Sequence, residues 1–238
     1  MVHKDPREEI KQLLRAGRLE DVLVRAAALH GHYCPGMAYG VKAGYAGLRR
    51  LGFDNTGMEE LIAVVECNNC FVDGVQMTTG CTFGNNALLF KDLGKTAVTI
   101  VSRKLGQAVR IMLRPRNWDR EDASDLEKEA STLAQKLIVE RQDDPEASAR
   151  LAQVWPQMSL LTIAQPEEKL FDIQDAPADL PAYAPLHGSV TCAICGEEFM
   201  ETRGRLRAGQ TVCMSCAGVD CPAVTGHGIL LLAEGKMR

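Results

Sequence analysis

Apolar residues recur at helical spacing through much of the first 165 residues of this 238-residue chain. Because residues three and four positions apart share one face of a helix, this spacing predicts helices that bury one side. The clearest runs from 35 to 51, with Pro35 at the favoured first position and Gly52 just past its end. Three further helices are predicted, one opening at Asp5-Pro6 and the others over residues 19–29 and 122–140.

Short apolar runs rich in β-branched residues lie between these segments and predict strands. Residues 97–101 and 108–113 flank a turn at 102–107, which is typical of an antiparallel hairpin. The remaining predicted strands are 61–65, 160–163 and 170–173. Helices beside antiparallel strands indicate an α+β core of mainly antiparallel sheet with flanking helices, rather than a doubly wound parallel sheet.

A change in composition separates this core from the C-terminal end of the chain. Residues 166–186 contain one lysine, five acidic residues and four prolines, a composition typical of a stiff, acidic linker. We therefore predict a core domain over residues 1–180, a linker over 181–190 and a small zinc-binding domain over 191–238.

The small domain carries the clearest metal-binding motif. Cys192 and Cys195 form one C-x-x-C pair, and Cys213 and Cys216 form a second after 17 intervening residues. Each pair places two thiolates in one tight turn, so two pairs complete the tetrahedral shell of a structural zinc ion. So short a domain cannot bury a large core, and a metal supplies the missing stability. Within it, the segments 198–202 and 210–212 are expected to form a small hairpin.

A second group of cysteine and histidine residues lies in the core domain. Pro35 is expected to start a helix, so Cys34 becomes its N-cap, where the helix dipole favours the thiolate. His32 lies two residues earlier and can reach the same point. His30 is interpreted as a helix-end residue, because an imidazolium suits the dipole there. His32 and Cys34 are therefore candidate metal ligands or, without a metal, a base and a nucleophile.

More thiol and polar side chains follow the first predicted strand. Cys70, Asp73 and Gln76 are spaced three apart, so a helix would place them on one face. Asp73 is a candidate for orienting a ligand or moving a proton. Cys81 stands in a later glycine-containing stretch and is a further candidate ligand. Cys67 and Cys70 form an isolated C-x-x-C pair, which is a weak signal without a second pair.

Three motifs in this order resemble the E-subunit family of formylmethanofuran dehydrogenase: His-Gly-His-x-Cys-Pro-Gly, Cys-x-x-Asp-x-x-Gln and Gly-Cys-Thr-x-Gly-Asn. The resemblance covers about residues 20–165, and the four-cysteine module resembles the zinc ribbon that ends longer members. It implies an α+β core, a homodimer and a cysteine-lined cleft that binds metal. The cleft residues implied by motif match are His32, Cys34, Cys70, Asp73 and Cys81.

Charge and hydropathy narrow the classes of function. A formal net charge of −4 argues against a dedicated nucleic-acid binder, although Arg203, Arg205 and Arg207 form a local basic strip. No apolar run approaches the roughly 18 residues that a membrane helix needs. The charged N-terminus has no apolar signal core, so we expect a cytoplasmic protein without membrane contact.

Three functions fit these features. The first is a metal-binding accessory protein of molybdenum or tungsten enzymes, which docks its partner through the small domain. It would carry one structural zinc per chain and a second divalent metal in the core, held by His32, Cys34 and Cys81. The second is a free-standing metal- or thiol-dependent enzyme, although the chain has no motif for molybdopterin or an iron–sulfur cluster. The third is a zinc-ribbon regulator. The catalytic candidates are Cys34, His32, Asp73 and Cys70.

Overall fold

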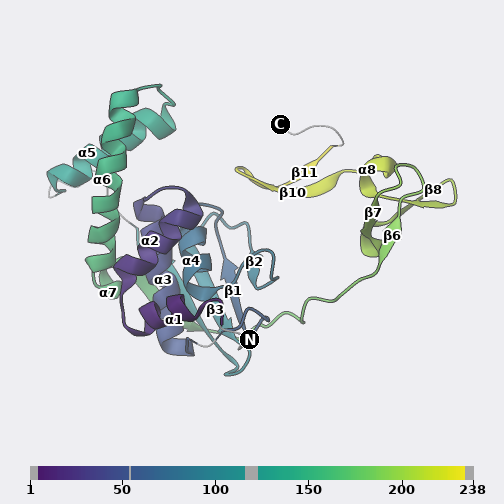
Figure 1. Ribbon diagram of the computed structural model, residues 1–238, viewed down its shortest axis with the longest axis horizontal. Coiled ribbons are helices and arrows are strands. Elements are labelled where there is room, and N and C mark those ends of the chain that lie inside the picture. Colours follow the sequence, from purple (N-terminus) through teal and green to yellow (C-terminus); the bar gives the residue numbers. More distant parts are fainter. Residues whose placement is uncertain (1–4, 54, 116–122, 234–238) are drawn as a thin grey trace. The chain divides into compact units, whose positions relative to one another are not determined.

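A computed structural model describes residues 5–53, 55–115 and 123–233 of the chain. The chain divides into two compact units, Met1–Pro181 and Ala182–Arg238 (Figure 1). The last residues of the predicted linker already belong to the first strand of the second unit, β6 (Ser189–Thr191). Within the described ranges, no helix combines the length and the apolar character that crossing a membrane requires.

The first unit is built on a five-stranded sheet with the order β2-β1-β3-β4-β5. Strands β1, β3, β4 and β5 pair antiparallel along the sheet. Strand β2 pairs parallel with β1, with Ala63 opposite Leu88, because helix α4 makes a crossover between the two. The α+β prediction with a mainly antiparallel sheet is therefore confirmed. The strands are β1 (Leu61–Val65), β2 (Leu88–Phe90), β3 (Ala97–Ser102), β4 (Gln107–Leu113) and β5 (Phe171–Ala176).

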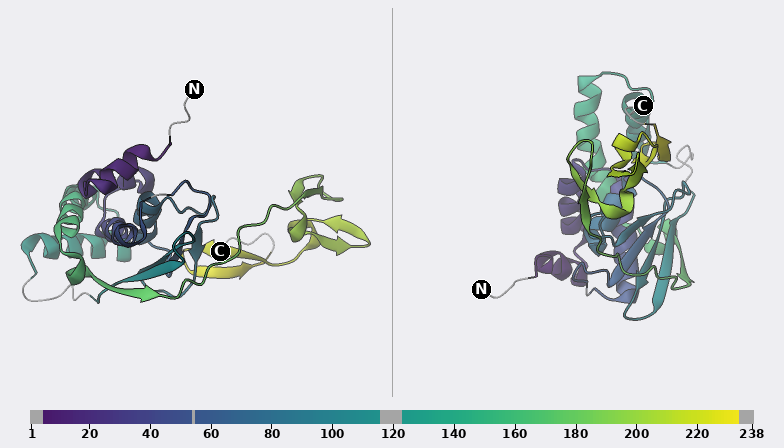
Figure 2. Two further views of the ribbon diagram at one scale, coloured as in Figure 1. Left: turned by 90° about the horizontal axis from the view of Figure 1, so that it is seen from below. Right: turned by 90° about the vertical axis from the view of Figure 1, so that its right-hand side faces the viewer.

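The helices of this unit gather on one face of the sheet (Figure 2). The helix predicted over 35–51 is confirmed, and its cap is Cys34, whose Sγ accepts the backbone N–H of Met37 at 3.4 Å. The helix predicted from residue 19 is also confirmed and ends at His30. The helices are α1 (Glu8–Arg15), α2 (Leu19–His30), α3 (Pro35–Leu51), α4 (Phe71–Thr79), α5 (Asp125–Ala134), the π-helical turn η1 (Gln135–Val139), α6 (Pro145–Ala164) and α7 (Glu167–Leu170).

Two predictions in the later part of the core need correction. The strand predicted over 160–163 is wrong, because these residues are the last turn of α6. The apolar, β-branched run there resembles a strand, but Val154, Met158 and Thr162 are buried at helical spacing. The helix predicted over 122–140 is divided into α5 and η1, and its residue 122 lies outside the described residues.

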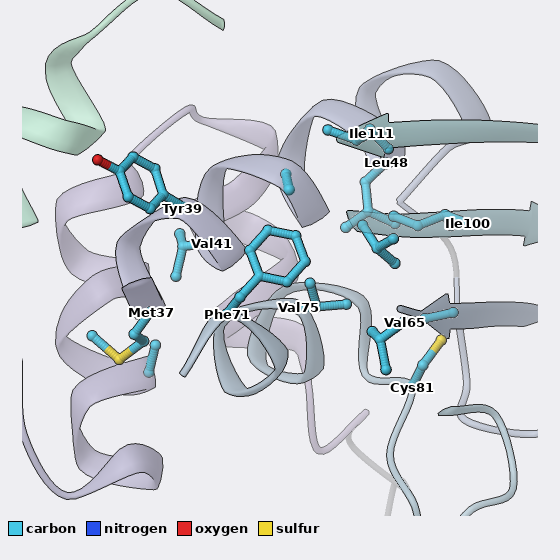
Figure 3. Close-up of a cluster of buried hydrophobic side chains, with 14 of the residues drawn as sticks. Met37, Tyr39, Val41, Leu48, Val65, Phe71, Val75, Cys81, Ile100 and Ile111 are labelled. Carbon is cyan, nitrogen blue, oxygen red and sulfur yellow. The ribbon is translucent and has the colours of Figure 1, made fainter. Parts of the chain in front are cut away.

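Helices α3 and α4 pack against each other with almost no space between their backbones. A Cβ added at Gly40 of α3 would overlap the carbonyl oxygen of Phe71, and one added at Gly74 of α4 would overlap that of Met37. The buried side chain of Phe71 lies at the centre of the apolar cluster, between Val41 of α3 and Val75 of α4 (Figure 3). The two glycines therefore set the distance between the helices.

A buried lysine fixes α6 to α3. The ammonium group of Lys42 donates to the carbonyl oxygen of Ile163 at 2.7 Å and also to that of Gln165. These carbonyls belong to the C-terminal end of α6, where a helix lacks backbone partners and carries partial negative charge. Because Lys42 is only 6% exposed, this contact lies inside the interface between the two helices.

The second unit consists of small hairpins around the four cysteines. Strand β6 pairs with β7, β8 pairs with β9, and β10 pairs with β11. The hairpin predicted between 198–202 and 210–212 is wrong, because each segment pairs with another strand, across its own turn. The elements are β6 (Ser189–Thr191), β7 (Glu198–Met200), the 3-10 turn η2 (Glu201–Arg203), β8 (Arg205–Arg207), β9 (Gln210–Val212), α8 (Met214–Ala217), β10 (Cys221–Thr225) and β11 (Gly228–Leu232).

The contact between α3 and α4 generates a test. Gly40→Ala is expected to lower the free energy of unfolding by at least about 1–3 kcal/mol, because the new methyl group overpacks a tight interface. Gly84→Ala is the matched control: nothing lies within 4 Å of its added Cβ, so a change within about 0.5 kcal/mol is expected. Urea unfolding measures both, and equal stabilities of the two variants would contradict the role given to Gly40.

Candidate functional site

The four cysteines of the second unit form one compact group. Their Sγ atoms all lie within 4.8 Å of one another, and those of Cys195 and Cys213 are 4.0 Å apart. Tetrahedral zinc with bonds to sulfur of about 2.3 Å needs separations of roughly 3.8 Å, so the group fits one zinc ion. Gly196 follows the first pair at a φ of +77°, as a tight turn there requires.

Backbone N–H groups point at these sulfurs and favour their charged form. Cys213 donates to the Sγ of Cys192, and Cys216 donates to the Sγ of Cys213, each at 3.4 Å. The N–H of Cys195 and then that of Cys213 lower the pKa of the Cys192 thiol to about 6. Four cysteine donors leave no position for a substrate, which is the arrangement of a structural zinc site.

A second group of donors lies in the core, where three segments of chain meet. His30 is the last residue of α2, His32 lies in the connection to α3, Cys34 caps α3 and Cys70 caps α4. One ligand atom from each residue lies within 4.8 Å of all the others. Two imidazole nitrogens and two sulfurs form a donor set that suits zinc and other late first-row metals.

The orientation of His30 is set by its neighbours on α4. Its Nδ1 lies 2.7 Å from Oδ2 of Asp73, and the other carboxylate oxygen of Asp73 accepts from Nε2 of Gln76 at 2.9 Å. The Nε2 of His30 lies 3.7 Å from the Sγ of Cys34. With the proton on Nδ1 directed at Asp73, the Nε2 lone pair faces the thiols, as in the carboxylate–histidine–metal arrangement of many metalloproteins.

The two thiols of this group share a proton. The hydrogen bond with Cys34, aided by the charge on His30, lowers the pKa of Cys70 to about 5 in spite of burial. The same hydrogen bond, together with burial, raises the pKa of Cys34. Burial lowers the pKa of His30, but the Asp73 carboxylate and the Cys70 thiolate outweigh it and raise the pKa overall. The group therefore holds one thiolate beside an imidazole that is readily protonated.

His32 differs from the other three donors because its side chain is exposed. Its ring lies 4.3 Å from that of His30 and stacks on the indole of Trp155 at 5.1 Å, with 26° between the planes. Burial and the nearby His30 lower the pKa of His32, which favours the neutral imidazole that binds metals.

The structure groups some of the predicted core residues and separates others. It brings His32, Cys34 and Cys70 together, and it places Asp73 beside them through His30. Cys81 is not a member of this group. It is buried near Val65 of β1 (Figure 3), where its Sγ donates to the carbonyl oxygen of Leu61 at 3.3 Å.

Two residues of the site are not anticipated by the sequence patterns above. His30 is interpreted there as a helix-end residue, and it does end α2, but its side chain also joins the donor group. The alternation His30-x-His32-x-Cys34 is the available signal, because alternate residues of an extended connection share one side. Trp155 comes from α6, more than a hundred residues later, and no local pattern connects it with the site.

The fold and the two donor groups together define a protein with an α+β core and an appended C4 zinc finger. Residues 188–220 match the family described as the prokaryotic dksA/traR C4-type zinc finger. Residues 29–172, more than half of the chain, match the family described as FmdE, molybdenum formylmethanofuran dehydrogenase operon. The chain belongs to the FmdE family.

Two individual proteins are also similar to this chain. A protein of Archaeoglobus fulgidus named "Probable S-adenosyl-L-methionine-binding protein" is 38% identical over 225 residues, which is 93% of this chain. The chain spans 58% of the length of that relative. The crystal structure of an FmdE-like protein of tungsten formylmethanofuran dehydrogenase from Syntrophus aciditrophicus is 21% identical, with a TM-score of 0.49. That likeness covers 84% of this chain and 92% of the other.

Proposed function

We propose that the core binds a divalent transition metal through His30, His32, Cys34 and Cys70, and that the protein is a metal-binding accessory of molybdenum or tungsten enzymes. The observation that carries the proposal is the convergence of four nitrogen and sulfur donors within 4.8 Å of one another. A metal bound there would supply a Lewis acid or would itself be the cargo.

The electrostatics of the site support a metal rather than a plain structural role for these residues. An isolated buried thiolate would be costly, but here Cys70 lies beside His30 and at the start of a helix, both of which favour negative charge. The orientation of His30 by Asp73 is a further feature that a structural histidine does not need. These features together prepare donors that are deprotonated and directed to one point.

The first test is the metal content of the full chain. Elemental mass spectrometry is expected to find two metal ions per wild-type chain, one in the zinc finger and one in the core. Cys34→Ser is expected to retain one, because it removes a core donor. Cys81→Ala is the matched control and is expected to retain two, because Cys81 bonds Leu61 instead. A single metal in wild-type protein loaded with excess zinc, or two in Cys34→Ser, would contradict the core site.

The accessory role rests on the family and on the donor chemistry. The description of the family names the molybdenum formylmethanofuran dehydrogenase operon, which supports a connection with such enzymes. Thiolate and imidazole donors suit the handling of soft and borderline metals. In this proposal the protein is a homodimer, and the zinc finger, with its closed shell of donors, provides a rigid surface for the partner enzyme.

Purification from the native host under gentle conditions tests this role. The tagged chain is expected to bring down a molybdenum or tungsten enzyme, and its own mass is expected to be twice the 26.0 kDa of one chain. Cys192→Ser is expected to abolish the association by disrupting the zinc finger, whereas Cys34→Ser is expected to preserve it. Recovery of the chain alone, as a monomer, would refute both the partner and the dimer.

A second candidate function is the binding of S-adenosylmethionine by an enzyme-like core. It is favoured by the name of the Archaeoglobus fulgidus relative, which matches nearly the whole of this chain. The half-buried Trp155 offers an aromatic surface beside the donor group. Calorimetric titration of the metal-loaded chain is expected to show saturable binding that is weakened in Trp155→Ala. Absence of heat at millimolar ligand would remove this candidate.

A further inference from the structure

Three of the four core donors are held in place by the fold. His30 is bonded to Asp73, and Cys34 accepts a backbone N–H of its own helix. Cys70 is fixed at the start of α4, where Gly36 leaves room for it: a Cβ added at Gly36 would lie 3.2 Å from the Cβ of Cys70. These donors cannot move without disturbing the packing of the helices.

His32 has a different environment. It follows Gly31, whose φ of +92° ends α2, and it lies in the short connection before α3. Its side chain is exposed, and it touches the rings of His30 and Trp155. Among the four donors, His32 is therefore the one that can turn away from the site at the smallest cost to the fold.

Trp155 is well fixed, in contrast to the imidazole that it covers. It belongs to α6, and its neighbours Val154 and Met158 are buried against α5. The C-terminal end of the same helix is bonded to Lys42 of α3. The indole is therefore a rigid surface brought to His32 from a distant part of the chain.

We propose that Trp155 is a positioning residue that holds His32 at the core metal site, so that the exchange of metal and external ligands occurs by unstacking of His32 from Trp155. This inference rests on the proposed core site and adds a route of exchange to it. An incoming donor must displace one of the four existing donors, and His32 is the exposed one. The stack thus controls how long His32 stays bound.

The rate of metal release to an excess of a chromophoric chelator tests this inference in the full, metal-loaded chain. Trp155→Ala is expected to speed release from the core by roughly 2- to 10-fold, the range that an aromatic pair supplies. Trp155→Phe is expected to stay close to wild type, because it keeps a ring under His32. The core phase of release is identified as the one missing from Cys34→Ser.

Two controls accompany this measurement. The zinc finger of the same molecule serves as an internal control, and its phase of release is expected to be unchanged. Phe83→Ala removes an aromatic ring that is 78% exposed and is expected to leave both phases unchanged. Equal core rates in wild type and Trp155→Ala would overturn the proposal.

A double variant separates positioning from general loosening of the fold. In His32→Ala the metal is held by three donors, so adding Trp155→Ala is expected to produce no further change in the release rate. If the two effects multiply instead, Trp155 acts through the stability of α6 and the proposal is wrong. Failure of the core site itself has a different signature, because wild-type protein would then show no core phase at all.

Fluorescence gives a readout that does not depend on kinetics. The chain has two tryptophans, so Trp118→Phe leaves Trp155 as the emitting indole. Paramagnetic Co²⁺ bound beside His32 is expected to quench this emission in the core-competent chain. No such quenching is expected when Cys34→Ser is added. Emission that does not respond to Co²⁺ while the core binds it would contradict the stacked geometry.

Discussion

The close approach of α3 and α4 is the constraint on which both the core and its site depend. Gly40 and Gly74 remove the side chains that would hold the helices apart, and the two backbones then touch. As a result the N-terminal ends of both helices meet, and their caps are Cys34 and Cys70. Unpaired N–H groups at helix N-termini favour thiolates, so the packing that stabilises the core also prepares its sulfur chemistry.

The two donor groups of the chain are built on different physical principles. The zinc finger takes its four cysteines from residues 192–216, in a unit whose small hairpins bury little apolar surface, so metal and fold depend on each other there. The core group takes its donors from residues 30–70 and lies on an apolar cluster that exists without it. A site of this second kind can lose and regain a metal while the domain stays folded, as metal handling requires.

The sequence predicted the elements whose signals are local. Pro35 and Gly52 marked the ends of α3, the hairpin of β3 and β4 followed from alternation around a turn, and the zinc finger followed from cysteine spacing. The end of α6 was mistaken for a strand because its burial depends on tertiary contacts. Trp155 reaches the site through the docking of α6 on α3, which rests on Lys42 and has no signature near either residue.

The family and the Archaeoglobus fulgidus relative carry names that differ, one from a molybdenum enzyme operon and the other from S-adenosylmethionine binding. A shared fold does not settle such differences, because function depends on the site that a fold carries. In this chain the site combines three donors locked by helix packing with one exposed histidine under an indole. A fully locked set would serve structure alone, and a fully exposed set would not retain a metal. The mixed arrangement retains a metal and still admits an external ligand, which is the property that both metal transfer and metal-assisted binding of a small molecule require.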